Sequence, residues 1–182
     1  MNKFTLNPND TSLLVIDFQE KLVPAMHRSE DTLKNAGVLM KMAKALEIPT
    51  IVTEQYPKGI GHTVEPLSLL FEGLTPVEKM SFSACTAEVE EALAKAPRQK
   101  ILIAGIETHV CVFQTVRALL DKGYQVFVVS DAVSSRREEN DQNGIALMQE
   151  MGAVITNTET VLFDLLKEST HPKFKELSKL IR

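Results

Sequence analysis

Continuous apolar runs of strand length are the feature that most constrains the fold of this chain. Three of them cover residues 12–18, 100–105 and 125–130, and the first reads Ser-Leu-Leu-Val-Ile-Asp-Phe. Runs that do not alternate with polar residues are typical of parallel strands covered on both faces. Parallel neighbours must be joined by a long crossover, which is usually a helix. The runs therefore predict an α/β protein.

Helical patterns lie between these runs. Apolar residues at helical spacing predict helices over about 29–46, 86–96, 138–151 and 159–166, and another that starts near Cys111 and closes at Gly123. Further strands are expected over 50–53 and 153–156, with a strand or loop over 77–82. We therefore predict one domain over residues 1–182, a doubly wound, Rossmann-like parallel sheet with helices on both faces.

In such a fold the ligand crevice lies beyond the carboxyl ends of the strands. Four features are expected on that rim: Asp17, the Gly- and Pro-rich loop 54–63, the turn 106–110, and Asp131. The glycines of the loop, Gly59 and Gly61, would suit a mobile lid.

Composition narrows the function. Hydrophobic residues make up 44% and charged residues 24%, which is typical of a globular protein. The net charge of -4 argues against nucleic-acid and anionic-membrane partners, which need a basic surface. The first residues do not resemble an export signal, and no apolar run reaches the roughly 18 residues that a membrane span needs. With only two cysteines and no recognisable export signal, we expect a cytoplasmic protein with reduced thiols.

The sequence lacks the motifs of several common enzyme classes. The sequence has no Gly-x-Gly-x-x-Gly after the first strand, no Gly-x-x-x-x-Gly-Lys-Ser/Thr and no Gly-x-Ser-x-Gly. Its four histidines have no paired spacing of the kind that metal sites use. Dinucleotide, P-loop and serine-hydrolase functions are thus disfavoured, and we predict neither a metal nor a cofactor.

Cys111 stands where a strand turns into a helix. A thiol in the first helical turn meets the positive end of the helix dipole, which favours the thiolate and makes Cys111 a candidate nucleophile. The alternative is a small buried hydrophobe. Asp17 and Lys79 are further candidates, although Asp17 could cap a turn and Lys79 could be a surface lysine. His109 is a rival partner for Cys111, but residues two apart in a helix point to different sides.

Three motifs in order resemble those of the isochorismatase-like cysteine hydrolase superfamily, which includes nicotinamidases and N-carbamoyl amide hydrolases. They read Leu14-Val-Ile-Asp-Phe-Gln, Glu78-Lys-Met-Ser-Phe-Ser and Gly105-Ile-Glu-Thr-His-Val-Cys-Val. The resemblance implies a catalytic triad of Asp17, Lys79 and Cys111. It also implies an oxyanion hole made by the backbone amides of Glu107 and Cys111, and a cis peptide bond between Ile106 and Glu107.

The metal-binding motif of the nicotinamidases is missing from this sequence. Those enzymes carry an Asp-x-His metal motif after the second strand, where this chain reads Thr53-Glu-Gln-Tyr-Pro. This stretch is more similar to the isochorismatase-domain-containing branch, so no metal is expected. By their place on the rim, Gln19, Leu22 and Tyr56 are candidate pocket residues, or else ordinary loop and core positions.

The resemblance implies a metal-independent hydrolase of a small amide or related C–N bond. Cys111 would form a thioester that water then releases, and the protein is expected to form a dimer or a larger homo-oligomer. One alternative is an isochorismatase-type vinyl ether hydrolase in which Asp17 protonates the substrate and Cys111 is dispensable. Another is a non-catalytic binding or thiol-sensing domain on the same fold.

Overall fold

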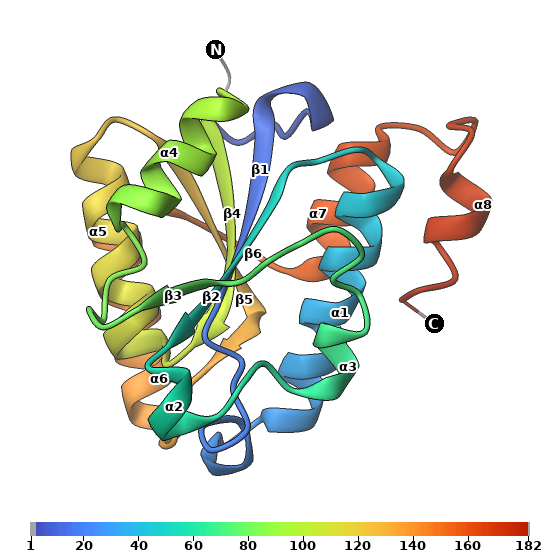
Figure 1. Cartoon of the computed structure of the whole chain (residues 1–182). Coiled ribbons are helices and arrows are strands. Elements are labelled where there is room, and N and C mark those ends of the chain that lie inside the picture. Colours follow the sequence, from blue (N-terminus) through green and yellow to red (C-terminus); the bar gives the residue numbers. More distant parts are fainter. Residues whose placement is uncertain (1–2, 182) are drawn as a thin grey trace.

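The sheet has six parallel strands in the order β3-β2-β1-β4-β5-β6 (Figure 1). The computed structural model describes residues 3–181. The strands are β1 Thr11–Ile16, β2 Thr50–Gln55, β3 Val77–Lys79, β4 Lys100–Ile106, β5 Gln125–Ser134 and β6 Val154–Thr156. All five neighbouring pairs are parallel, so the predicted fold class is confirmed.

Helices cover both faces of this sheet, as Figure 1 shows. On one side lie α1 Ser29–Ala45, α7 Thr158–Leu166 and α8 Phe174–Leu177. On the other side lie α4 Ala87–Lys95, α5 Phe113–Asp121 and α6 Glu138–Glu150. Short helical turns complete the chain: η1 Pro8–Asp10, η2 Val23–Ala25, α2 Pro57–Ile60, α3 Glu65–Ser68 and the π-helical turn η3 Thr108–Val112. Among the described residues no helix is long and apolar enough to cross a membrane.

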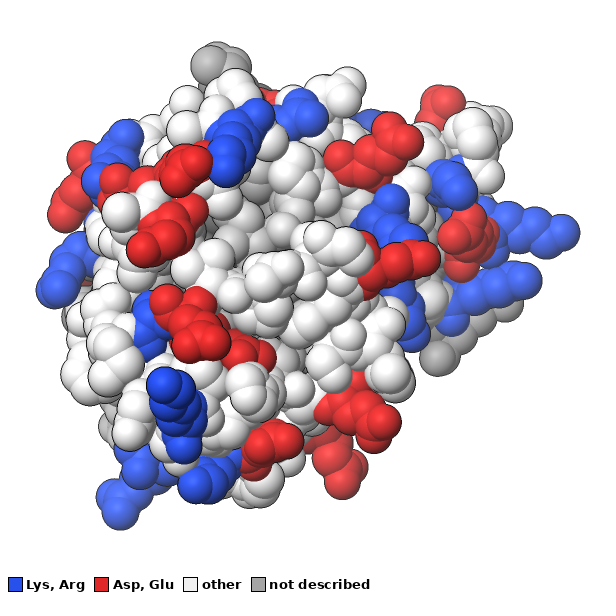
Figure 2. Space-filling model, viewed as in Figure 1, with Lys and Arg blue, Asp and Glu red and all other residues white. Residues whose placement is uncertain are grey.

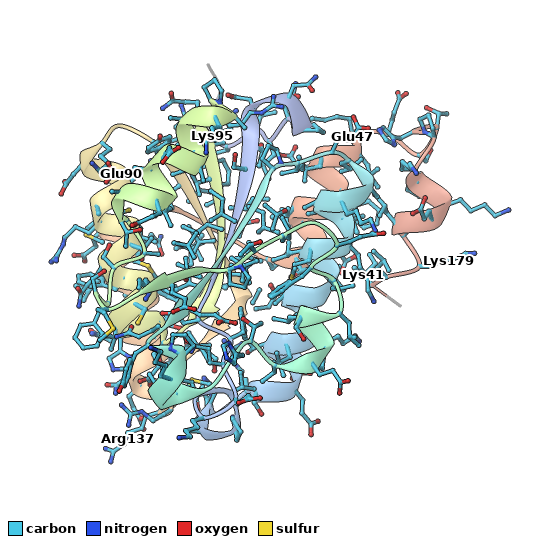
Figure 3. All side chains as sticks on the ribbon, viewed as in Figure 1. Lys41, Glu47, Glu90, Lys95, Arg137 and Lys179 are labelled. Carbon is cyan, nitrogen blue, oxygen red and sulfur yellow. The ribbon has the colours of Figure 1, made fainter. Side chains whose placement is uncertain are left out.

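The apolar runs are continuous because each strand supplies two cores. Leu13 and Val15 of β1 pack on the α1 side, whereas Leu14 and Ile16 pack on the α4 side, and all four are fully buried. Burying a side chain of this kind stabilises the fold by about 1.5–3 kcal/mol. Side chains fill the space between the sheet and the helices, while charged residues such as Lys41 and Lys95 project outward (Figure 3). This double packing holds the carboxyl ends of the strands rigidly in one row.

Local capping sets the start of two helices. The side chain of Thr86 accepts a hydrogen bond from the amide of Val89 at the start of α4, and Asn157 does the same for Thr160 at the start of α7. Such caps satisfy backbone N–H groups that have no partner within the helix. The predicted boundaries of the long helices lie within one or two residues of the observed ones.

Two expectations about the rim are wrong. β5 continues to Ser134, so Asp131 lies inside the strand, and its carboxylate accepts hydrogen bonds from the amide and hydroxyl of Thr158 at 2.9 Å each. Asp131 thus anchors α7 and is not at the crevice. The stretch 54–63 is not a single loop, because Glu54 and Gln55 belong to β2 and are paired with β3, and α2 follows.

Gly105 allows the two central strands to approach closely. A Cβ placed there would lie 2.6 Å from Ile16 Cβ and 2.9 Å from the Ile16 carbonyl oxygen. We expect Gly105→Ala to lower the free energy of unfolding by about 1–3 kcal/mol, the usual cost of overpacking a core. Urea denaturation followed by circular dichroism measures this.

Gly37→Ala in α1 is the matched control. Its added Cβ would meet only Leu67 Cδ2, at an ordinary 3.7 Å. Because alanine favours helices over glycine by roughly 0.5–1 kcal/mol, this variant should be neutral or more stable. Equal stability of the Gly105→Ala variant and the wild type would contradict the close approach.

Candidate active site

Asp17 and Lys79 form a fully buried ion pair at the carboxyl edge of the sheet. Lys79 Nζ lies 2.6 Å from Asp17 Oδ2, and both side chains are 0% exposed. Asp17 directly follows β1 and Lys79 ends β3, so the long lysine side chain crosses the end of β2 to reach the carboxylate. The structure thus brings together two residues that are 62 positions apart.

The surroundings of Lys79 Nζ consist of hydrogen-bond acceptors. Besides Asp17, it donates to Gln55 Oε1 at 3.2 Å and to the carbonyl oxygens of Ser81 and Phe82 at 3.1 Å each. An ammonium group has only donors to offer, so this cage suits the charged lysine. A buried ammonium without an anion is costly, and Asp17 as the carboxylate supplies the compensating charge.

The Asp17 carboxyl group is held from both oxygens. Thr53 Oγ1 donates to Oδ1 at 2.7 Å, while Lys79 binds Oδ2. Burial raises the pKa of Asp17 above its ordinary value, although Lys79, Thr53 and a hydrogen bond from Cys111 oppose the shift. The backbone of Asp17 is left-handed, with φ 57°, a conformation that aspartate tolerates better than most residues. The result is a carboxylate with increased affinity for a proton.

Cys111 lies in the π-helical turn η3, with 7% of its surface exposed. Burial and the neighbouring Asp17 charge raise its pKa to about 12, against the opposing influence of Lys79 and the amide of Glu107. This shift favours the thiol at neutral pH, against the thiolate expected from the helix end, because desolvation and an adjacent carboxylate both disfavour the charged form.

Gln55 is a site residue that the sequence did not reveal. Its Oε1 accepts from Lys79 and, at 3.5 Å, from the Cys111 thiol, while its Nε2 donates to the Met80 carbonyl oxygen at 3.3 Å. The side-chain oxygen thus has two donors as partners, and the side-chain nitrogen has one acceptor. This pattern determines which end of the Gln55 amide is oxygen and which is nitrogen. The sequence property that could have revealed it is strand register. Gln55 is the last residue of β2, which lies between β1 and β3, and it pairs with Lys79.

The turn after β4 directs backbone groups toward the thiol. The peptide bond between Ile106 and Glu107 is cis, as the resemblance implies. The Glu107 amide forms a hydrogen bond with the Cys111 sulfur, and its carbonyl oxygen accepts from Val110 at 3.1 Å and Val112 at 3.2 Å. This geometry places an N–H donor beside the sulfur, where a substrate carbonyl oxygen would need one.

The other candidate residues have different positions. Gln19 is fully buried and ties the chain together, because its amide bonds the backbone of Gln55 and Gly61. Leu22 packs against the core cluster of the α1 face. Tyr56 is 47% exposed and borders a pocket of about 340 Å³ beside Lys79. His109 Nδ1 is bonded to Ser135 Oγ at 2.9 Å and not to Cys111.

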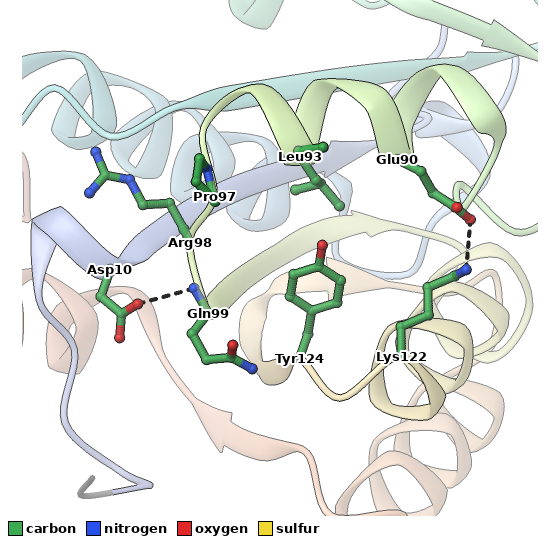
Figure 4. A pocket seen from close by; sticks show the side chains of 9 residues that line it. Asp10, Glu90, Leu93, Pro97, Arg98, Gln99, Lys122 and Tyr124 are labelled. Carbon is green, nitrogen blue, oxygen red and sulfur yellow. Dashed lines mark hydrogen bonds and ion pairs between the residues drawn. The ribbon is translucent and has the colours of Figure 1, made fainter.

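A larger pocket of about 620 Å³ lies at the opposite edge of the sheet (Figure 4). Its lining includes Asp10, Gln99 and Tyr124, which precede β1, β4 and β5 and so mark their amino ends. This pocket is remote from Cys111. Within residues 3–181 no group of three or more His, Cys, Asp or Glu side chains is placed to hold a metal ion.

Comparison with known proteins identifies the family. Residues 11–160 match the isochorismatase domain. The chain belongs to the isochorismatase family. The matched span includes Asp17, Lys79, Cys111 and Gln55, so the whole site lies within the family domain.

Relatives in this isochorismatase family cover nearly the whole chain. Isochorismatase domain-containing protein 2 of Xenopus laevis is 41% identical over 177 residues, which are 97% of this chain and 85% of that protein. The structure of MAR1 ribonuclease from Caenorhabditis elegans superposes with a TM-score of 0.93 at 42% identity, covering 97% of this chain and 92% of that one. The Escherichia coli YcaC product, an octameric hydrolase of unknown specificity, shares the fold with a TM-score of 0.92 at 24% identity over 98% and 89% of the two chains.

The charge of Asp17 should control the titration of Cys111. Because this carboxylate raises the pKa of the thiol, Asp17→Asn should lower that pKa, and the thiolate should appear at lower pH than in the wild type. Ultraviolet absorbance of the thiolate along a pH series measures this, with the Cys111→Ser spectrum subtracted to remove Cys85 and the tyrosines. An unchanged or higher pKa of Cys111 in Asp17→Asn would contradict the assignment.

Proposed function

We propose that this isochorismatase-family protein hydrolyses a small amide or related C–N bond through a thioester on Cys111. The observation that carries the proposal is the contact between a protonated thiol and a buried carboxylate whose pKa is raised, with Lys79 Nζ 2.6 Å from that carboxylate. A neutral thiol is a weak nucleophile, so it needs a base within hydrogen-bond reach. Asp17 is that base.

The first step forms the carbon–sulfur bond. Asp17 accepts the thiol proton while the sulfur of Cys111 attacks the substrate carbonyl carbon. Lys79 stays charged and keeps the carboxyl group of Asp17 in place. The carbonyl oxygen becomes an oxyanion that accepts hydrogen bonds from the backbone amides of Glu107 and Cys111.

The second step breaks the carbon–nitrogen bond. Asp17 returns its proton to the leaving nitrogen, and ammonia or an amine departs, leaving the acyl group on sulfur. Asp17 then takes a proton from an attacking water, the thioester carbon–sulfur bond breaks, and the sulfur recovers a proton from Asp17. The products are a carboxylic acid and the amine, and the enzyme is unchanged.

Gln55 can assist this sequence. In the resting site the single thiol proton is shared between the Asp17 carboxylate and Gln55 Oε1, which lies 3.5 Å from the sulfur, and once the proton has moved to Asp17 this oxygen faces no thiol donor. A free carbonyl oxygen beside the sulfur could accept an N–H of the leaving group. This favours amides over substrates whose leaving group has no N–H donor.

Hydrolysis of RNA is the second candidate, because the C. elegans protein is named a ribonuclease. Two features favour a small amide instead. The net charge is -4, and the face in Figure 2 intersperses acidic and basic residues without a continuous basic tract. The lysine of the site is fully buried and already paired, so it is not available to a phosphate.

The decisive experiment is intact mass spectrometry of the protein after exposure to formamide, acetamide, nicotinamide and N-carbamoylglycine. We expect an acyl adduct that peptide mapping assigns to Cys111. Cys111→Ala should lose at least about 1,000-fold in turnover, as expected when a nucleophile is removed. Cys85→Ala, which changes the other free cysteine, is the matched control and should retain activity.

Each other outcome contradicts the proposal in a recognisable way. Turnover of isochorismate that survives Cys111→Ala would point to vinyl ether hydrolysis with Asp17 as the acid. Cleavage of an RNA oligonucleotide without an adduct would point to a ribonuclease. Binding of these compounds, or thiol modification, without turnover would point to a binding or thiol-sensing domain. The cytoplasmic location and the homo-oligomeric state stay predictions.

A further inference from the structure

We propose that Asp141 is a positioning residue for the oxyanion turn, which we define as residues 106–109. Asp141 lies in the first part of α6 and is only 3% exposed. Its role is to hold Thr108, and through it the backbone amides on either side, against the body of the protein. This inference rests on the proposed thioester chemistry, because it concerns the donors that bind the oxyanion.

The Asp141 carboxylate makes three contacts. Thr108 Oγ1 donates to Oδ1 at 2.5 Å, Arg28 Nη2 donates to Oδ2 at 2.8 Å, and His27 Nε2 lies 3.1 Å from the same oxygen. Thr108 is 0% exposed. A hydrogen bond to a charged acceptor in such a dry environment is roughly twice as strong as a neutral one. The bond to Thr108 therefore fixes the turn firmly.

Arg28 in turn fixes Asp141 to the sheet. The same Nη2 atom also donates to the carbonyl oxygens of Ser130 at 3.1 Å and Val133 at 3.2 Å, both in β5. The start of α6 adds the positive end of a helix dipole, which stabilises a carboxylate. Asp141 is thus a rigid point between the sheet, α6 and the turn.

Thr108 is well placed to transmit this rigidity. It follows Glu107 directly and precedes Cys111 by three residues, and the amides of Glu107 and Cys111 are the proposed oxyanion donors. Catalysis depends on donors placed within a fraction of an ångström, and a misplacement of about 1 Å can cost on the order of 100-fold in rate. Loss of the Thr108–Asp141 bond should therefore weaken oxyanion binding.

Other contacts join the same two segments but are less protected. The Glu107 carboxylate pairs with Arg136, whose side chain is 66% exposed. His109 Nδ1 is bonded to Ser135 Oγ, and a Cβ added at Gly144 would come within 3.0 Å of His109 Cα. Among these contacts, the bond of Asp141 to Thr108 is the one that joins two nearly fully buried side chains, whereas the Glu107 carboxylate, which also accepts from the Arg136 amide at 3.1 Å, is paired with an exposed guanidinium.

The test compares two reactions of Cys111. Acylation by p-nitrophenyl acetate develops an oxyanion, whereas alkylation by iodoacetamide displaces iodide and develops none. We expect Thr108→Val and Asp141→Asn to slow acylation by about 10–100-fold while alkylation stays within about twofold of the wild type. Thr108→Ser keeps the hydroxyl and should restore acylation. Both rates are followed by mass spectrometry of the adduct mapped to Cys111.

Thr158→Val is the matched control. Thr158 is 2% exposed and its Oγ1 donates to the half-buried Asp131 Oδ1 at 2.9 Å, joining β5 to α7, so the variant loses a threonine–aspartate side-chain bond away from the turn while the Thr158 amide still donates to Asp131. It should lower the free energy of unfolding without slowing acylation. Thermal unfolding of each variant checks that the compared proteins are folded.

The outcomes separate this inference from the proposed function. If Thr108→Val acylates at the wild-type rate, or if acylation and alkylation fall together, the positioning role of Asp141 is overturned. If the double variant Thr108→Val/Asp141→Asn is slower by the product of the single effects, the two residues do not act through one bond, which also overturns it. If wild-type Cys111 is not acylated at all, the proposed function itself fails.

Discussion

The buried ion pair of Asp17 and Lys79 is the interaction on which the site depends. It joins the ends of β1 and β3, which are not neighbours, and β2 between them supplies Thr53 and Gln55 to complete the hydrogen bonds. Removing one partner of a buried pair typically costs about 3–5 kcal/mol, because the other charge remains without compensation. The pair can exist only because the sheet, packed on both faces, brings these strand ends together.

The same burial determines the protonation state of the nucleophile. A cysteine thiol in water has a pKa of about 8.5 and ionises at mildly alkaline pH. In this site, desolvation raises the pKa of both Asp17 and Cys111, that of Cys111 to about 12, which favours the thiol at neutral pH and increases the affinity of the Asp17 carboxylate for a proton. The sulfur of Cys111 is therefore activated during the attack, when its proton moves to Asp17, and no thiolate needs to exist beforehand. A protected resting thiol would also resist oxidation, which proceeds through the thiolate.

Much of the fold could be predicted because apolar runs and helical spacing are local properties of the sequence. The strand–helix alternation, the parallel sheet and the place of Cys111 in a strand–turn–helix all follow from such patterns. Other features depend on pairing that no local pattern contains. β5 extends past Ser130 through its pairing with β4, and Gln55 becomes part of the site through its register with Lys79.

The protonation of Cys111 was the least predictable property. The helix end argued for a thiolate, whereas the degree of burial and the contact with Asp17 are known only from the folded structure. Likewise, Asp141 gave no signal in the sequence, because its three partners come from separate segments. Motifs identified the reacting groups, and the three-dimensional arrangement supplied the groups that position them.

The most direct test of the account is the infrared S–H stretching band of Cys111 in the resting enzyme at neutral pH. The band is assigned by its loss in Cys111→Ser, with Cys85→Ala as the background to remove the second thiol. We expect the band to be present in the resting enzyme and to disappear when the acyl adduct forms. A resting enzyme without an S–H band from Cys111 would contradict it, because the nucleophile would then be a preformed thiolate.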